Sequence, residues 1–109
     1  MRKIVLVLAV FFMLCSFAWA DSYESITVAA TAIGPTPATV GYATWGMCRC
    51  ETAELRYTMD GQTTPTNLIG VIIEPMEWVI LNNPDQIKNF KAIRTTGADG
   101  YLKCHYFQR

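Results

Sequence analysis

Four side chains have the chemistry of metal ligands: Cys48, Cys50, Cys104 and His105. A structural zinc site needs such ligands to converge on one point. Cys104 and His105 are adjacent in a segment with strand-like alternation, and adjacent strand residues point to opposite faces. The Cys-x-Cys spacing also lacks the two-residue spacer of the usual zinc knuckle. We therefore expect a disulfide or buried thiols here, and neither a metal ion nor another cofactor.

Nucleophilic catalysis would have to use His105, because it is the single histidine of the chain. Beyond the first twenty residues the serines are Ser22 and Ser25, and neither lies in a Gly-x-Ser-x-Gly elbow. We therefore expect an exposed histidine on a strand and a protein that is not an enzyme.

A polar loop follows the segment Leu55–Met59 and offers a carboxylate, hydroxyls and an amide. Such loops at the end of a β-sandwich can hold calcium or a sugar. An Asp-Gly turn followed by Thr and Pro also needs no ligand to explain it. The candidate ligand-binding residues are Asp60, Gly61, Thr63, Thr64, Thr66 and Asn67.

Four aromatic residues, Tyr42, Trp45, Trp78 and Tyr101, are candidates for a sugar-binding platform. Core packing is the competing interpretation. For Trp78, within the apolar run Trp-Val-Ile-Leu, core packing is the leading expectation.

The first twenty residues have the layout of a secretory signal peptide. Arg2 and Lys3 precede an apolar run, and Ala18-x-Ala20 provides small residues for cleavage before Asp21. An uncleaved membrane anchor is the alternative. We expect the protein to be secreted, periplasmic or at the cell surface, with a membrane contact only through this segment if it is retained.

Residues 21–109 are enough for one small domain. Without Arg2 and Lys3, seven basic and nine acidic residues remain, a balance of −2. This charge is not typical of a nucleic-acid-binding protein.

Three cysteines remain after cleavage, an odd number for an oxidising compartment. Cys48 and Cys50 are two apart on one strand face and rarely satisfy disulfide geometry with each other. Cys104 is therefore the expected partner of one of them, and we favour Cys50–Cys104.

Short apolar runs bounded by turn residues recur along the chain, and none has a sustained helical period. This predicts an all-β fold, a small antiparallel sandwich of jelly-roll or immunoglobulin-like kind with about seven strands. The buried positions change parity between Cys50 and Leu55, which predicts a β-bulge near 51–53. Asp85 is expected to cap one helical turn. The expected strands are 25–33, 39–50, 55–59, 68–73, 78–81, 90–95 and 101–107.

From about Cys48 onward, the order of several segments resembles a family of small phage-associated β proteins of virion or decoration type. The resemblance implies a structural role, without catalytic residues to carry across. The chain differs by its secretory signal and by a longer loop at 62–64. The matching segments are 50–57, 60–61, 65–66, 70–75, 85–95 and 102–107.

The turn Tyr57–Gly61 followed by Pro65-Thr66 is similar to a turn in the accessory β modules of chitobiases. That resemblance implies an immunoglobulin-like, carbohydrate-binding module. The sequence as a whole predicts an exported, non-enzymatic assembly or adhesion protein, virion-associated or on a cell surface, whose partners are other protein subunits. Thr-rich edge segments such as 27–32 could pair with another subunit. A secreted carbohydrate-binding domain is the alternative.

Overall fold

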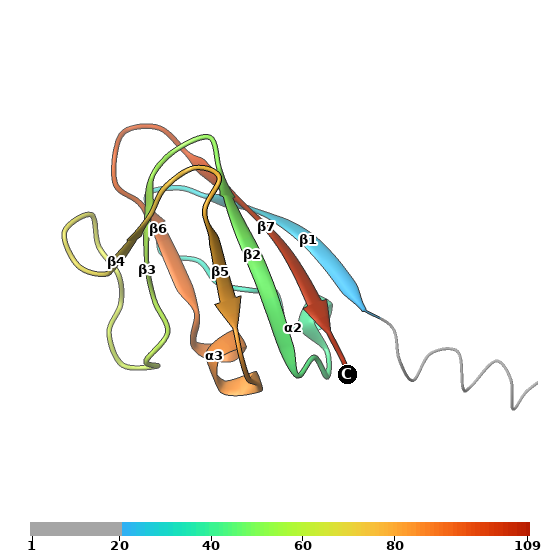
Figure 1. Cartoon of the computed structure of the whole chain (residues 1–109). Helices are drawn as coiled ribbons and strands as arrows, with labels where there is room; N and C mark the ends of the chain where they lie inside the picture. The colour runs from blue at the N-terminus through green and yellow to red at the C-terminus, as the bar shows by residue number, and fades with distance from the viewer. Residues whose placement is uncertain (1–20) are drawn as a thin grey trace, which may run out of the picture.

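The computed structural model describes residues 21–109, and the predicted signal peptide, residues 1–20, lies outside them. Within the described residues, seven strands form two antiparallel sheets that share one core (Figure 1). The predicted all-β sandwich of about seven strands is confirmed. The elements in chain order are β1 (Ser22–Val28), α2 (Pro37–Val40), β2 (Trp45–Glu51), β3 (Leu55–Thr58), β4 (Val71–Ile73), β5 (Trp78–Leu81), α3 (Pro84–Asn89), β6 (Lys91–Arg94) and β7 (Gly100–Phe107).

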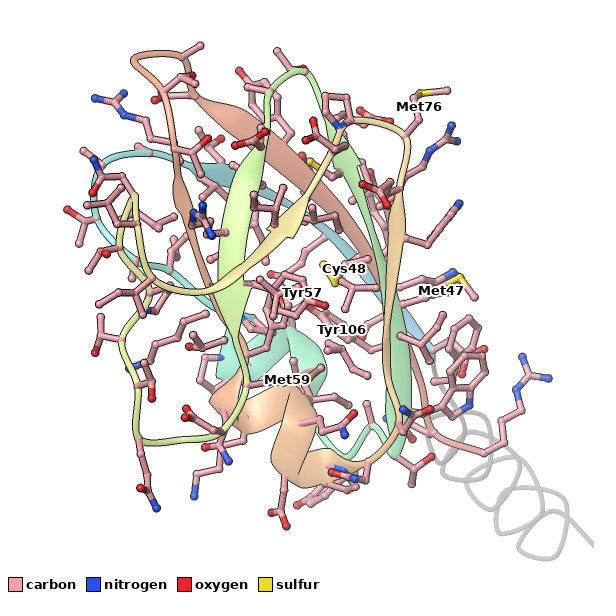
Figure 2. The ribbon with its side chains drawn as sticks, turned by 60° about the vertical axis from the view of Figure 1, so that its left-hand side comes forward. Met47, Cys48, Tyr57, Met59, Met76 and Tyr106 are labelled. Atoms are coloured by element: carbon pink, nitrogen blue, oxygen red, sulfur yellow. A yellow bond between two sulfur atoms is a disulfide. The ribbon has the colours of Figure 1, made fainter. Side chains whose placement is uncertain are left out.

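The larger sheet, sheet A, has the strand order β1-β7-β2-β5, so the last strand lies between two early ones. Leu102, Cys104 and Tyr106 of β7 are buried on its inner face, as their two-residue spacing predicts. The intervening side chains point away from the core and form the outer face of sheet A. Figure 2 shows the same alternation in β2, where Cys48 points between the sheets and Met47 points outward.

The smaller sheet, sheet B, has the order β4-β3-β6. Leu55 of β3 pairs with Ile73 of β4, and both are buried against sheet A. Only the last three residues of the expected strand 68–73 form β4. Burying a side chain of this size contributes roughly 1.5–3 kcal/mol, so these two residues hold a short edge strand in place.

The chain crosses from sheet A to sheet B after β1. We expected one strand over residues 25–33, but β1 ends at Val28. The backbone then bridges to β6, where Ile33 and Ala92 exchange both of their hydrogen bonds, at 2.9 and 2.8 Å. The expected strand is therefore shared between the two sheets.

A second crossing explains the change in parity between β2 and β3. The expected β-bulge is wrong, because the chain leaves sheet A after Glu51 and enters sheet B at Leu55. Thr52 in the connection has a φ of 79°. Inward and outward residues alternate within each sheet, and the parity of the inward positions changes where the chain passes from one sheet to the other.

The two helices are short and lie at one end of the sandwich (Figure 1). Helix α2 was not predicted. Helix α3 was, but its cap is not Asp85, because the side-chain oxygen of Asn83 accepts the amide of Gln86 at 2.9 Å. Pro84 then occupies the first turn, so the cap lies one residue before it.

The disulfide joins Cys48 to Cys104, and the predicted Cys50–Cys104 pair is wrong. The register of β2 and β7 places Cys48 directly opposite Cys104, whereas Cys50 lies opposite Leu102. Cys50 is instead a buried free thiol. A disulfide in the described domain is compatible with an oxidising compartment.

Candidate functional site

The carboxylate oxygens of Asp60 in the predicted ligand-binding loop accept hydrogen bonds from the loop itself. One carboxylate oxygen of Asp60 accepts the amides of Gln62 and Thr63, at 3.0 and 2.8 Å, and the other accepts the Thr63 hydroxyl at 2.6 Å. These bonds, the Thr63 hydroxyl first, lower the pKa of Asp60 to about 2. Gly61 has a φ of 76°, as its place in the turn requires.

The second half of the loop is bonded in the same way. The hydroxyl of Thr66 accepts the amides of Leu68 and Ile69, at 3.2 and 3.0 Å. The backbone oxygen of Asn67 accepts the Arg56 Nε at 3.2 Å. Thr64 is exposed at the surface. These hydrogen bonds explain the conformation of the loop without a bound ligand.

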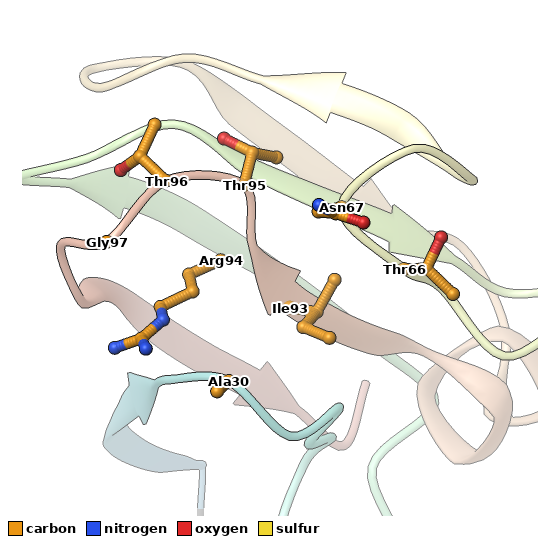
Figure 3. Close-up of a pocket in the computed structure, with 8 residues that line it drawn as sticks. All are labelled: Ala30, Thr66, Asn67, Ile93, Arg94, Thr95, Thr96 and Gly97. Atoms are coloured by element: carbon orange, nitrogen blue, oxygen red, sulfur yellow. The ribbon is translucent and has the colours of Figure 1, made fainter.

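The end of this loop borders a hollow of about 490 Å3 on sheet B (Figure 3). Of the six predicted loop residues, Thr66 and Asn67 are among those that line it. Its charged side chain, Arg94, already forms an ion pair with Asp99 at 2.6 Å. The rim of the hollow is rich in threonine, and the hydroxyls of Thr66, Thr95 and Thr96 already form hydrogen bonds within the chain. Its lining residues are Ala30, Thr66, Asn67, Ile93, Arg94, Thr95, Thr96 and Gly97.

The outer face of sheet A carries a much larger set of aromatic and apolar side chains, which we call the aromatic face. All four strands contribute, because each alternates between the core and this face. Exposure is high for side chains near both edges: Tyr23 is 59% exposed and Trp78 is 54% exposed. The aromatic face consists of Tyr23, Ser25, Thr27, Trp45, Met47, Arg49, Glu51, Trp78, Ile80, Tyr101, Lys103, His105 and Phe107.

A neighbouring side chain lies against five rings of the aromatic face, those of Trp45, Trp78, Tyr101, His105 and Phe107. Trp45 stacks on Phe107, with ring centroids 4.1 Å apart, and His105 stacks on Phe107 at 4.4 Å. The Arg49 guanidinium lies 5.6 Å from the Trp78 ring, and the Lys103 ammonium lies 5.4 Å from the Tyr101 ring. These contacts hold the rings in place and leave less free ring surface for a sugar to stack on.

The structure brings three of the four predicted platform residues, Trp45, Trp78 and Tyr101, to the aromatic face. Tyr42 lies elsewhere, in the connection after α2, and is 90% exposed. The expectation that Trp78 packs in the core is wrong. Strand β5 is an edge strand, and Val79 and Leu81 are its inward residues.

Sequence reasoning missed several members of the aromatic face, among them Met47, Arg49 and Ile80. An available signal was the two-residue spacing of Trp78 and Ile80, opposite in parity to Val79 and Leu81. Since all four residues are apolar, that spacing did not say which pair faces solvent.

The cysteine and histidine candidates do not converge. Cys104 is buried in the disulfide and His105 is exposed on the aromatic face, the opposite orientations that the strand pattern predicts. Among residues 21–109, no group of three or more metal-ligating side chains is positioned to hold an ion.

The free thiol of Cys50 is enclosed between the sheets. Its sulfur lies 3.2 Å from the Ala53 carbonyl oxygen and 3.7 Å from that of Ile73. Burial, followed by the charges of Glu74, Glu77 and Glu51, raises the pKa of this thiol to about 11. The protonated, neutral thiol is therefore the form that this site favours.

Comparison of the chain with family models, with curated proteins and with solved structures found no match. The resemblances to phage-associated and chitobiase-type β proteins stay predictions. None of the helices within residues 21–109 is long and apolar enough to cross a membrane.

Proposed function

We propose that this chain is an exported, non-enzymatic assembly or adhesion protein that binds other protein subunits through the aromatic face. A virion-associated or cell-surface role fits this proposal, and so does export by the N-terminal segment. The observation that carries it is the concentration of exposed aromatic and aliphatic side chains on one outer sheet face, whose charged members are Arg49, Glu51 and Lys103.

The composition of this face supports a protein partner. Protein interfaces are enriched in Tyr, Trp, Phe, Met and Arg, and the aromatic face holds all five. Four large apolar side chains of this face, Tyr23, Trp78, Ile80 and Tyr101, are exposed, and such a grouping is typical of an interaction site. Rings that are already fixed by neighbours lose little freedom when a partner covers them, which favours binding.

Photo-crosslinking tests this proposal. A photoreactive phenylalanine analogue replaces Tyr23 on the aromatic face or, as the control, Tyr42 outside it, which is the more exposed of the two. The protein is incubated with surface and secreted proteins of the organism that encodes it. We expect protein adducts from position 23 and few from position 42. Equal labelling at both positions, or none at position 23, would contradict the proposal.

A carbohydrate-binding domain is the second candidate, favoured by the presence of Trp45, Trp78 and Tyr101 on one face. Glycan-array binding that is lost in W45A and W78A would support it. D60A serves as the control, because the Asp60 carboxylate is engaged within its own turn.

A further inference from the structure

We propose that the partner of the aromatic face is a second copy of this chain, related by a two-fold axis. This inference rests on the proposed function and names the partner for that same face. The axis crosses the strands between the row of Arg49 and Lys103 and the row of Glu51 and Tyr101. The two aromatic faces then pack against each other, with the Arg49–Lys103 row of one copy over the Glu51–Tyr101 row of the other.

The first observation is a pair of like charges. Arg49 and Lys103 lie directly opposite each other on β2 and β7 and point to the same side. Like charges at such positions repel and destabilise a sheet. Within the described residues the ion pairs are Arg94–Asp99 and Arg109–Asp21, so neither Arg49 nor Lys103 has a carboxylate there.

Within residues 21–109, the side-chain acceptor of Arg49 is a weak one, the Met76 sulfur. Its Nη2 contacts the Met76 sulfur at 3.1 Å, and its Nε is buried with no hydrogen-bond partner in the described part of the chain. A polar group in this state needs an explanation. The buried Nε is out of reach of another molecule, but a carboxylate from one would give the Nη atoms a charged acceptor in place of the sulfur.

The second observation is that the complementary groups lie one row away on the same face. Glu51 and Tyr101 are paired across β2 and β7, two residues along from Arg49 and Lys103. A two-fold rotation between the rows sets Arg49 over Glu51 of the second copy. The same rotation sets Lys103 over the ring of Tyr101. Each contact occurs twice, as a self-complementary interface requires.

The edge of the face extends this pattern. Trp78 pairs with Arg49, and Met76 follows in the next row, where its amide donates to the carbonyl oxygen of Cys50 at 2.8 Å. Figure 2 shows Met76 at the end of β5 that is nearer the connection to β4, on the same side of the sheet as Met47. The rotation therefore sets Trp78 over Met76 of the second copy, a favourable sulfur–ring contact.

Met76 is 66% exposed and has a φ of 77°, a conformation that costs a residue with a side chain energy. Contact with a second copy would give this exposed, strained position a role.

The face is small for a dimer interface. The four strands, which have four to eight residues each, cover roughly 400 Å2 at ordinary strand spacings. A standard stable interface buries about 800 Å2 per partner. We therefore expect a weak, reversible dimer that forms at tens to hundreds of micromolar protein, with stronger association at low salt because charged pairs hold it.

Sedimentation equilibrium of the protein purified from expression of the full-length gene tests the inference, with intact mass to establish its N-terminus. Each charge reversal, R49E or E51R, should weaken association at least tenfold. An equimolar mixture of the two variants should associate again, because every charged contact between them is complementary. The double variant R49E/E51R should also associate. K91E, a reversal at an exposed residue on sheet B, is the matched control and should leave association unchanged.

Near-ultraviolet dichroism and the mass of the disulfide-linked peptides check that each variant is folded. If a charge reversal does not fold, the neutral variants R49Q and E51Q replace it. Each neutral variant should weaken association, and an equimolar mixture of the two should not restore it.

Three results would overturn the inference: a monomer at millimolar concentration, association that is indifferent to both reversals, or a mixture no better than its components. A monomer that still crosslinks through position 23 to another protein would contradict the two-fold dimer but agree with the proposed function. A monomer that forms no crosslinks would contradict both the dimer and the proposed function.

Discussion

At the scale of single residues, Cys50 is the group whose behaviour the fold changes most. Its pKa of about 11 in the folded protein exceeds the ordinary value of 9.0, chiefly because burial disfavours the thiolate. We expect iodoacetamide at pH 8 to label Cys50 very slowly in the native protein and rapidly in denaturant. Mass spectrometry of the peptide that contains Cys50 measures both rates. Rapid labelling of the native protein would show that the thiol is accessible.

The sign of the linked pH effect follows from the raised pKa of Cys50. The neutral thiol is the form that the core favours, so its contribution to stability is complete below about pH 9. That contribution falls as the pH rises toward 11. The C50A variant should lose this part of the alkaline destabilisation.

Asp60 is the second residue with a clear pH signature. Its lowered pKa, about 2, means that the carboxylate stabilises the loop above its ordinary pKa of 3.8. This contribution is lost as the pH falls from about 4 to 2. The midpoint temperature of D60A should therefore lie below that of the wild type at pH 7 and approach it at pH 2. D60N, which retains an acceptor oxygen, should be intermediate. A difference that does not change with pH would contradict this account.

At the scale of elements, the disulfide ties β2 to β7 across 56 residues of sequence. A closed loop of this length stabilises the folded state by about 4 kcal/mol on the chain-entropy model. Equilibrium unfolding in urea of C48A/C104A should show a loss of that order. Unfolding of the wild type with and without reductant provides the comparison. Peptide mapping that found a Cys50–Cys104 bridge would contradict the register of the two strands.

Within the same sheet, Tyr106 of β7 forms a side-chain hydrogen bond to the neighbouring strand β1. Its hydroxyl donates to a carboxylate oxygen of Glu24 at 2.6 Å, and that oxygen also accepts the amide of Thr36 at 2.9 Å. Burial first, and then this hydrogen bond, raise the pKa of Tyr106. The Y106F variant keeps the ring but removes the donor, so we expect a loss of about 1–3 kcal/mol in unfolding free energy. A variant as stable as the wild type would show that water replaces the hydroxyl without cost.

At the scale of the whole molecule, stability should be highest at the centre of sheet A. Strand β7 is paired on both sides and holds one half of the disulfide, whereas β4 is a three-residue edge strand. Hydrogen exchange followed by mass spectrometry should find the slowest amides in 100–107 and much faster exchange in 71–73. Equal protection of the two segments would contradict this ranking.

Much of the fold could be predicted from local patterns. The alternation in 101–107 and the turn at Asp60–Gly61 predicted elements that the structure contains, because side-chain period and turn chemistry act over a few residues. Helix α2, by contrast, has four residues and no buried side chain, so it left no apolar period to detect.

Local signals in the sequence were enough to predict a β protein of about seven strands, because strand alternation and turn chemistry depend on neighbouring residues. The three-dimensional structure was needed to show which cysteine pairs with Cys104 and which side of Trp-Val-Ile-Leu faces solvent. Both depend on the pairing of strands that are far apart in sequence. The aromatic face is a consequence of that pairing, because its rows exist only when β1, β7, β2 and β5 lie side by side in register.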